Sequence, residues 1–357
     1  MAAIDRIRPE IRALTAYHVP PPGDFIKLDA MENPYPLPAS VRARLGERLA
    51  DAAFNRYPDA NPFALKRRIA ATMGVPPESA ILLGNGSDEI IQMLAQAVAQ
   101  PGASLLSVEP AFVMFRMLAR SCGLEYLGVP LRADFSLDLD ALLAVIEARQ
   151  PALIFLAIPN NPTGNVFPRA AVAAVLAAST GIVVVDEAYF PFTDGSYLDW
   201  LAQYPGLLVM RTLSKLGLAG IRLGFLAGSP ALIDQLEKVR LPYNLSLATQ
   251  IIAETVLESA EVLAEQSALL RQERARLGAA LALRPRVETF PSEANFVLIR
   301  LPEPDAVFDA LKRHGILVKN LNSAHGLLRG CLRITVGTPH ENDRFLGALD
   351  ASLLPGT

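Results

Sequence analysis

Four apolar segments of this chain are followed by polar residues whose types and spacing could bind a charged ligand. The segment that ends at Leu83 leads into Gly86, Ser87 and Asp88. Glycine lets a ligand approach the backbone, and the free N–H groups at the start of a helix suit a phosphate. The alternative is an ordinary glycine turn in which the serine or aspartate caps a helix. A second segment leads into Asn161, whose amide could bond a ligand oxygen, although Asn-Pro is also a frequent turn.

The other two segments are followed by an acid and an amine. Asp186 comes directly after Ile182–Val185, where it could pair with a cationic ring nitrogen, and Tyr189 could reach the same ligand. The alternative for Asp186 is a helix cap. Lys215 follows Leu207–Met210. A partly desolvated lysine loses its proton more easily and can attack an aldehyde, whereas the usual alternative is an exposed surface lysine.

Arg222 completes a set of groups that one cofactor requires. It lies seven residues after Lys215 and could clamp an anion through two parallel hydrogen bonds. Together the four segments would place a phosphate cradle, an amide, a carboxylate and an amine at one edge of a sheet. Pyridoxal phosphate needs this combination, because its phosphate, its ring nitrogen and its aldehyde each require one of these partners.

The elements that must position these residues alternate along the chain. Between residues 39 and 245, short continuous apolar runs alternate with segments of helical composition. This pattern is typical of an α/β fold with a mostly parallel sheet flanked by helices, so we predict a large cofactor-binding domain here. The predicted strands are Ala80–Leu83, Ser104–Val108, Ala152–Ile158, Ile182–Val185 and Leu207–Met210, and two of the predicted helices are Glu89–Ala99 and Pro168–Ala178.

The two ends of the chain differ from this middle part. Residues 1–38 are rich in proline and predict an arm without much regular structure. Residues 246–357 predict a smaller α+β domain that begins with a long connecting helix, bent or split, because 243–277 contain neither glycine nor proline. Its predicted elements are the strands Asn295–Leu301, Ile316–Asn320 and Cys331–Val336 and the helix Asp305–His314. A last helix follows, and Thr338 and Glu341 would form a capping box at its start.

Composition excludes several classes of protein. The 357 residues carry 33 basic and 36 acidic side chains, and this near balance argues against a nucleic-acid binder. Two cysteines exclude a disulfide framework, and the four histidines show no metal-ligand spacing. The first residues, MAAIDRIRPEIR, carry charges at positions where a signal peptide would be apolar. No segment is long and apolar enough to span a membrane. We therefore expect a cytoplasmic protein without a metal, a membrane or a nucleic-acid partner.

Several motifs together resemble a known family. GNGSDE, NNPTG, DEAY, TLSK, AGIRLG and CLRITVG occur in the order found in fold type I pyridoxal-phosphate-dependent aminotransferases. RYPD, EPAF and ANFVLIR are similar, more narrowly, to histidinol-phosphate aminotransferases. The likeness extends from about Leu28 to about Leu349. It implies the cofactor pyridoxal 5'-phosphate and a step of histidine biosynthesis, in which an amino group passes between L-histidinol phosphate and 2-oxoglutarate to give imidazole acetol phosphate and L-glutamate.

The resemblance assigns cofactor roles to individual residues. It implies that Lys215 holds the aldehyde and then moves the proton from the substrate's Cα, and that Asp186 keeps the ring nitrogen protonated. Asn161 and Tyr189 would bond the phenolic oxygen, and Phe112 would stack on the ring. The groups that would hold the phosphate belong to Gly86, Ser87, Asp88, Thr212, Ser214 and Arg222.

The resemblance also implies substrate contacts and a homodimer. Tyr57 would reach the cofactor phosphate of a neighbouring subunit, and Tyr17 would help to close the arm over the substrate. Arg333 would bind the carboxylate of glutamate or the phosphate of histidinol phosphate. The chain departs from the family at Lys319, where an arginine is frequent. A lysine can neutralise an anion there but lacks the planar two-point grip of arginine.

Three alternatives share the predicted cofactor site. An aromatic amino-acid aminotransferase of the same fold would differ in whether it captures a carboxylate or a phosphate. A phosphothreonine decarboxylase would also need a phosphate pocket. A non-catalytic regulator that binds the cofactor would be joined to a DNA-binding domain, for which the proline-rich segment before residue 39 leaves no room.

Overall fold

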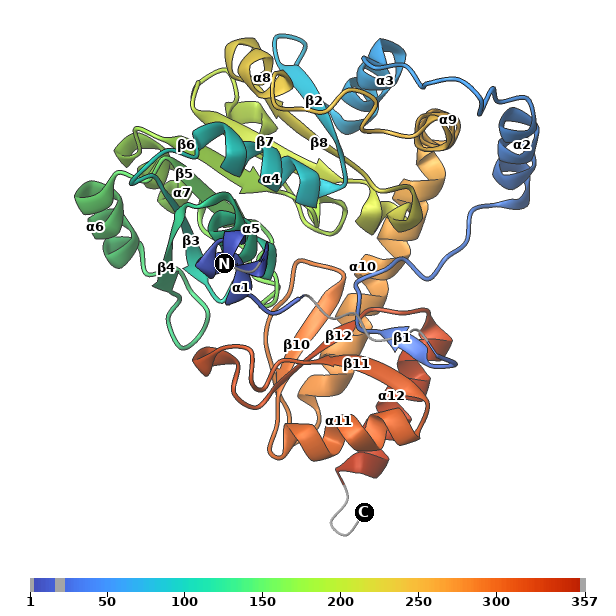
Figure 1. Ribbon diagram of the computed structural model, residues 1–357. Coiled ribbons are helices and arrows are strands. Elements are labelled where there is room, and N and C mark those ends of the chain that lie inside the picture. The colour runs from blue at the N-terminus through green and yellow to red at the C-terminus, as the bar shows by residue number, and fades with distance from the viewer. Residues whose placement is uncertain (1–2, 17–22, 354–357) are drawn as a thin grey trace.

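The computed structural model describes residues 3–16 and 23–353, and its elements gather around two sheets (Figure 1). The predicted site residue Tyr17 lies outside the described residues. The first elements are short: a 3-10 helix η1 (Ala3–Arg6), the helix α1 (Pro9–Arg12) and the strand β1 (Ile26–Leu28). The limits predicted for an arm at 1–38 and for domains at 39–245 and 246–357 stay a prediction.

The larger sheet has seven strands, and all but one of them run parallel. Only β8 is antiparallel to its neighbours β2 and β7 within this sheet. Four of its inner strands are buried along their whole length, as a sheet covered by helices on each side requires. In spatial order they are β2 (Ala80–Asn85), β8 (Leu223–Gly228), β7 (Leu207–Thr212), β6 (Ile182–Asp186), β5 (Leu153–Ala157), β3 (Ser104–Glu109) and β4 (Glu125–Pro130).

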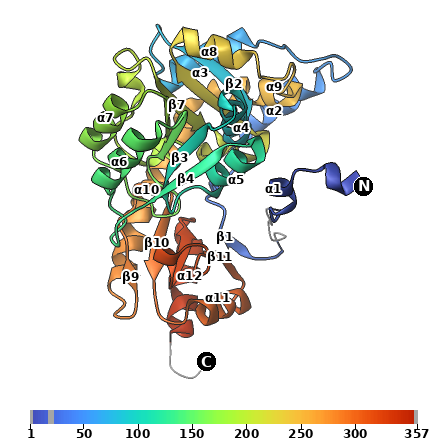
Figure 2. The ribbon, with the colours of Figure 1, turned by 60° about the vertical axis from the view of Figure 1, so that its left-hand side comes forward.

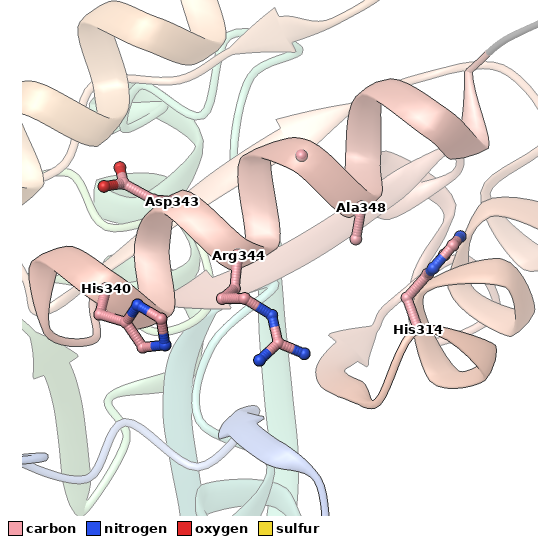
Figure 3. A pocket seen from close by; sticks show the side chains of 6 residues that line it. His314, His340, Asp343, Arg344 and Ala348 are labelled. Carbon is pink, nitrogen blue, oxygen red and sulfur yellow. The ribbon is translucent and has the colours of Figure 1, made fainter.

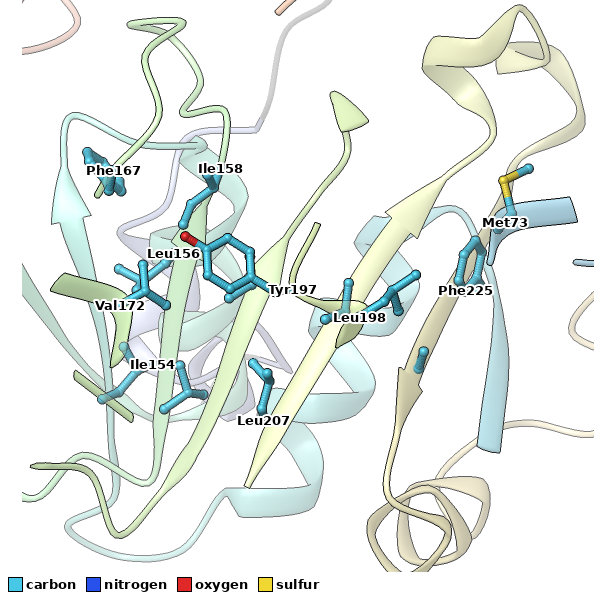
Figure 4. Close-up of a cluster of buried hydrophobic side chains, with 14 of the residues drawn as sticks. Met73, Ile154, Leu156, Ile158, Phe167, Val172, Tyr197, Leu198, Leu207 and Phe225 are labelled. Carbon is cyan, nitrogen blue, oxygen red and sulfur yellow. The ribbon is translucent and has the colours of Figure 1, made fainter. Parts of the chain in front are cut away.

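Two hydrophobic clusters bury the two faces of this sheet. On one face, α3 (Phe63–Met73), α6 (Leu139–Arg149), α7 (Arg169–Ala178) and α9 (Leu247–Leu257) contribute buried side chains, and Figure 4 shows part of this cluster. On the other face, α4 (Ser87–Val98), α5 (Val113–Cys122) and α8 (Pro230–Glu237) do so. The remaining elements of this part are α2 (Ala39–Ala50), η2 (Phe190–Phe192), η3 (Leu198–Trp200), η4 (Ser214–Leu216) and η5 (Ala219–Ile221).

The smaller sheet has five strands in the order β1, β11 (Ile316–Asn320), β12 (Cys331–Thr335), β10 (Phe296–Arg300) and β9 (Glu288–Thr289). It shares a third cluster with α10 (Ala260–Ala282), α11 (Pro304–Arg313) and α12 (Pro339–Ser352), and a short η6 (Gly326–Leu328) lies between β11 and β12. In Figures 1 and 2, α10 runs from beside the large sheet to the small one. The predicted α/β fold with a mostly parallel sheet and a smaller α+β part is confirmed.

Most local predictions hold, and the exceptions have physical reasons. The connecting helix is split, because Ser259 has a non-helical backbone between α9 and α10. The capping box of Thr338 and Glu341 is present at the start of α12. The strand β8 was not predicted, because Gly224 and Gly228 interrupt its apolar run. These glycines are required, since a Cβ on Gly224 would lie 2.8 Å from the Ser87 nitrogen and one on Gly228 would lie 2.1 Å from Leu208.

Candidate active site

A cavity of about 230 Å³ lies at the carboxyl ends of the parallel strands, where ligands bind in open α/β sheets. It brings together most of the residues singled out from the sequence. Those that line it are Ser87, Asp88, Phe112, Asn161, Asp186, Tyr189, Thr212, Ser214, Lys215 and Arg222. They come from segments more than a hundred residues apart, and the sheet edge gathers them.

Asp186 is the buried acid of this cavity. It is the last residue of β6 and is paired in register with Ala157 on β5 and Met210 on β7, so the centre of the sheet holds it in place. Its side chain accepts a hydrogen bond from the Ala188 N–H at 3.0 Å. Burial raises the pKa of Asp186 to about 7, because a carboxylate loses hydration in a low-dielectric site. A cationic partner in the cavity would reverse this shift.

Lys215 is the amine of the same cavity. It follows β7 within η4, and its Nζ donates to the Ala30 carbonyl at 3.2 Å and lies 6.0 Å from the centre of the Tyr189 ring. Burial, together with the positive charge of Arg333, lowers the pKa of Lys215 to about 8. The neutral, nucleophilic form of this amine is therefore much more populated near neutral pH than in an exposed lysine.

The start of α4 forms a cradle with the polar end of the cavity. Gly86 precedes the helix with a φ of 81°, and no side chain among the described residues caps the first turn, so its N–H groups are available to a ligand. Arg222 reaches this turn and bonds Asp88 at 3.2 Å. A Cβ on Gly86 would lie 2.7 Å from Arg222 Nη2. The donors and the missing side chain fit a phosphate.

Two hydroxyls and one aromatic side chain complete the cavity. Thr212 donates to Ser214 through their side-chain oxygens at 2.9 Å. Tyr189 packs edge-on against the ring of Phe296 at 5.3 Å between centroids, which fixes its ring beside Lys215. Thr212 ends β7, Ser214 follows that strand, and Tyr189 follows β6, so the two strands position these side chains.

A second cavity, of about 260 Å³, adjoins the first and shares Met31, Phe112 and Asn161 with it. Arg333 lies at this junction and donates to Asn161 Oδ1 at 2.5 Å and to the Asp29 carbonyl at 2.9 Å. Lys319 lines the same cavity.

Lys319 and Arg333 stand directly opposite each other in the register of β11 and β12. Like charges at such positions destabilise a sheet. An anion bound in the cavity would remove this repulsion, so the cation pair indicates an anionic ligand.

Sequence reasoning missed part of the lining. Met31 lines both cavities and has a left-handed backbone φ of 53°. Its N–H donates to the Thr335 hydroxyl, and its carbonyl accepts a hydrogen bond from the Asn295 side chain. The pairing of β1 with β11 brings this segment to the site, and such long-range pairing leaves no local signal. Glu109 ends β3 and could have been found as another strand end.

Tyr57 does not line either cavity. Its ring is 80% exposed and stacks on that of Tyr243 at 4.6 Å between centroids. Its expected role in a neighbouring subunit therefore stays a prediction.

A further hollow lies away from the site, between α12 and the end of α11. Figure 3 shows that His340 and Arg344 come from α12 and that His314 follows α11. Across residues 3–16 and 23–353, no group of three or more acidic, histidine or cysteine side chains is arranged for a metal ion. The same described part of the chain has no helix that is long and apolar enough to cross a membrane.

Comparison with known proteins agrees with this geometry. A family model described as aminotransferase class I and II matches residues 23–349. The histidinol-phosphate aminotransferase of Chromobacterium violaceum is 54% identical over 343 residues, 96% of each chain, and histidinol-phosphate aminotransferase 1 of Ralstonia nicotianae is 52% identical over 97% of this chain and 94% of that one. A crystal structure of the enzyme from Sinorhizobium meliloti in complex with pyridoxal-5'-phosphate has a TM-score of 0.87 at 26% identity and covers 98% of each chain. The chain therefore belongs to the class I and II aminotransferase family.

Proposed function

We propose that this aminotransferase binds pyridoxal 5'-phosphate and transfers the amino group between L-histidinol phosphate and 2-oxoglutarate, a step of histidine biosynthesis. The observation that carries the proposal is the cation pair of Lys319 and Arg333, which lines a cavity directly beside Lys215 and Asp186. An amine with an anionic end would place that end on the two cations and its nitrogen near Lys215. The likeness to histidinol-phosphate aminotransferases over nearly the whole chain supports this substrate.

The residues of the first cavity fit the cofactor. The uncapped start of α4 with Arg222 offers the donors that a phosphate needs, and Asp186 offers a buried carboxylate for the ring nitrogen. Pyridoxal phosphate, when bound, supplies an aldehyde that condenses with amines and a ring that takes up electron density from the substrate's Cα. Phe112 would cover one face of that ring, and Gly86, at the start of α4, would surround the phosphate together with Ser87, Asp88, Thr212 and Ser214.

Lys215 would do two things in this site. Its lowered pKa of about 8 makes the neutral amine accessible, and a neutral amine is the form that attacks an aldehyde. With the substrate in place, Lys215 Nζ would be free to take the proton from the substrate's Cα and to hold it within the site. The Ala30 carbonyl, 3.2 Å from Nζ, would hold the free ammonium.

Other side chains would orient the reactants. The carboxylate of Asp186 would hold the proton on the ring nitrogen, because a buried carboxylate favours a cation beside it. Asn161 and Tyr189 would bond the phenolic oxygen. Arg333 would bind either the phosphate of one substrate or a carboxylate of the other, with Lys319 beside it, and Tyr17 would close over them.

We also infer a cytoplasmic homodimer. Tyr57 stacks on Tyr243, and further large apolar side chains close to these two in sequence are also exposed, whereas monomers seldom expose many large apolar groups. A second copy of the chain would cover them and would receive the Tyr57 hydroxyl at its cofactor phosphate. The residues that support this surface are Phe54, Tyr57, Phe63, Leu241 and Tyr243.

Chemical trapping tests the cofactor site. The purified protein is reduced with borohydride, digested and analysed by mass spectrometry. We expect the mass of the reduced cofactor on the peptide that contains Lys215, and none on the peptide of Lys238, which lies at the end of α8 away from the cavity. Cofactor bound at another lysine, or no cofactor at all, would contradict the proposal.

A further inference from the structure

The outer wall of the second cavity contains charged side chains that the proposed reaction has not used. Arg116 belongs to α5, Glu109 ends β3, and His325 lies in the loop between β11 and β12. All three line the cavity that also contains Lys319 and Arg333. The wall therefore faces the anionic end of a bound substrate.

Arg116 is held in one orientation. Its Nε donates to Glu109 Oε1 at 3.1 Å, and its Nη2 donates to Glu109 Oε2. The guanidinium also lies 5.4 Å from the centre of the Tyr126 ring. These contacts use one edge of the planar group, and the side chain remains 41% exposed. A fixed guanidinium with a free surface on a cavity loses little entropy when it binds an oxyanion.

His325 offers a further donor. Its Nδ1 accepts the Leu327 N–H at 3.2 Å, so the neutral imidazole carries its proton on Nε2. Nε2 lies 3.8 Å from Glu109 Oε2, which is too far for a hydrogen bond. The Nε2–H group can therefore donate to a ligand in the cavity, which His325 lines.

The charges of the cavity match a phosphate better than a carboxylate. Arg116, Lys319 and Arg333 are cationic and Glu109 is anionic, which leaves two positive charges. A phosphate monoester carries about −1.5 to −2 at pH 7, whereas a carboxylate carries one charge. Around a carboxylate or an aromatic ring, at least one of the two positive charges of the cavity would remain without a counter-charge.

We propose that Arg116, positioned by Glu109, binds the phosphate of the substrate and is a specificity-determining residue of this enzyme. Lys319 is a point charge and cannot bind an oxyanion through two parallel hydrogen bonds, whereas the planar guanidinium of Arg116 can. Arg116 reaches the cavity from α5, beside the large sheet, and Lys319 and Arg333 belong to the small sheet. The phosphate would thus connect the two sheets of the protein. This inference rests on the proposed function, because it concerns the phosphate of the proposed substrate.

The test compares two amines that differ only in the phosphate. The half-reaction of the holoenzyme is measured with L-histidinol phosphate and with L-histidinol, for the wild type and for Arg116→Met. We expect kcat/KM for L-histidinol phosphate to fall about 10- to 100-fold, mainly through KM, because a hydrogen bond to a charged group is lost, and kcat/KM for L-histidinol to fall much less. Arg132→Met is the matched control, since Arg132 pairs with Asp138 at the surface and lines neither cavity.

A second variant separates this role from folding. Arg116→Met leaves Glu109 without its partner, so the double variant Glu109→Gln/Arg116→Met is measured as well, and the same selective loss is expected. An equal loss with both amines would show that Arg116 is merely structural, and an unchanged preference would also overturn the inference. If the wild type itself does not prefer L-histidinol phosphate to L-histidinol, the proposed function fails, and the inference fails with it.

Discussion

Replacing Asp186 by asparagine should stabilise the cofactor-free protein at pH 8. Burial raises the pKa of Asp186 from 3.8 to about 7. Between these values the native protein holds a proton that the unfolded chain has lost, so stability falls as the pH rises from about 4 to about 7. A pKa unit corresponds to about 1.4 kcal/mol, and the shift of about three units amounts to on the order of 4 kcal/mol.

Asparagine has nearly the same shape and carries no charge. Its Oδ1 can still accept the Ala188 N–H, whereas its buried Nδ2 would lack an acceptor, at a cost of about 1–2 kcal/mol. We therefore expect Asp186→Asn to gain about 2 kcal/mol at pH 8 and to lose about 1–2 kcal/mol near pH 4, where only the cost of the unpaired Nδ2 remains. Lys215 does not disturb this window. Its pKa is lowered from 10.5 to about 8, so its contribution changes with pH only between these values.

Urea unfolding of the cofactor-free proteins between pH 4 and pH 8, followed by circular dichroism, measures the difference. Asp194→Asn is the control, because its side chain is 87% exposed in a surface ion pair with Arg271, and we expect it to change stability by less than about 0.5 kcal/mol. Parallel pH profiles for Asp186→Asn and the wild type, or a less stable variant at pH 8, would refute the reasoning. With the cofactor added, the order should reverse, because only the carboxylate pairs with the ring cation.

Three further substitutions test other parts of the account. Gly86→Ala places a Cβ 2.7 Å from Arg222 Nη2 at a backbone φ of 81°. Cofactor affinity should therefore fall at least tenfold in a fluorescence titration, and an unchanged affinity would show that the start of α4 does not bind the cofactor phosphate. Glu187→Gln breaks a buried ion pair between Glu187 and Arg211, whose side chains are 3% and 5% exposed, respectively. The free energy of unfolding in urea should fall by about 3–5 kcal/mol, and a loss below about 1 kcal/mol would contradict the burial argument. Tyr57→Phe should weaken cofactor binding several-fold if its hydroxyl serves the neighbouring subunit, and equal binding would count against that contact.

The position of the cavity could be predicted from the sequence because it follows from parallel strands. Asp186 comes directly after one continuous apolar run and Lys215 five residues after the end of another, and the carboxyl ends of such runs must meet at one edge of the sheet. Their chemistry, a buried acid and a desolvated amine, follows from that placement. The family resemblance then assigned the remaining roles.

Other parts of the site carry no such local signal. Met31 reaches both cavities because β1 pairs with β11, almost three hundred residues away along the chain. Arg116 lies inside a helix, where an arginine is ordinarily a solvated side chain, and only the tertiary structure places it beside Lys319. The pairing of Lys319 with Arg333 likewise depends on the register of β11 and β12, which the sequence pattern leaves open.

The most direct test of the proposed function is one half-reaction without a keto acid. The holoenzyme is mixed separately with L-histidinol phosphate, L-phenylalanine and O-phosphothreonine, and the conversion of the cofactor from its aldehyde to its amine form is followed by absorbance. The account predicts fastest conversion by L-histidinol phosphate, because its phosphate matches the cations opposite each other on β11 and β12. Faster conversion by L-phenylalanine, or decarboxylation of O-phosphothreonine as the main reaction, would contradict it.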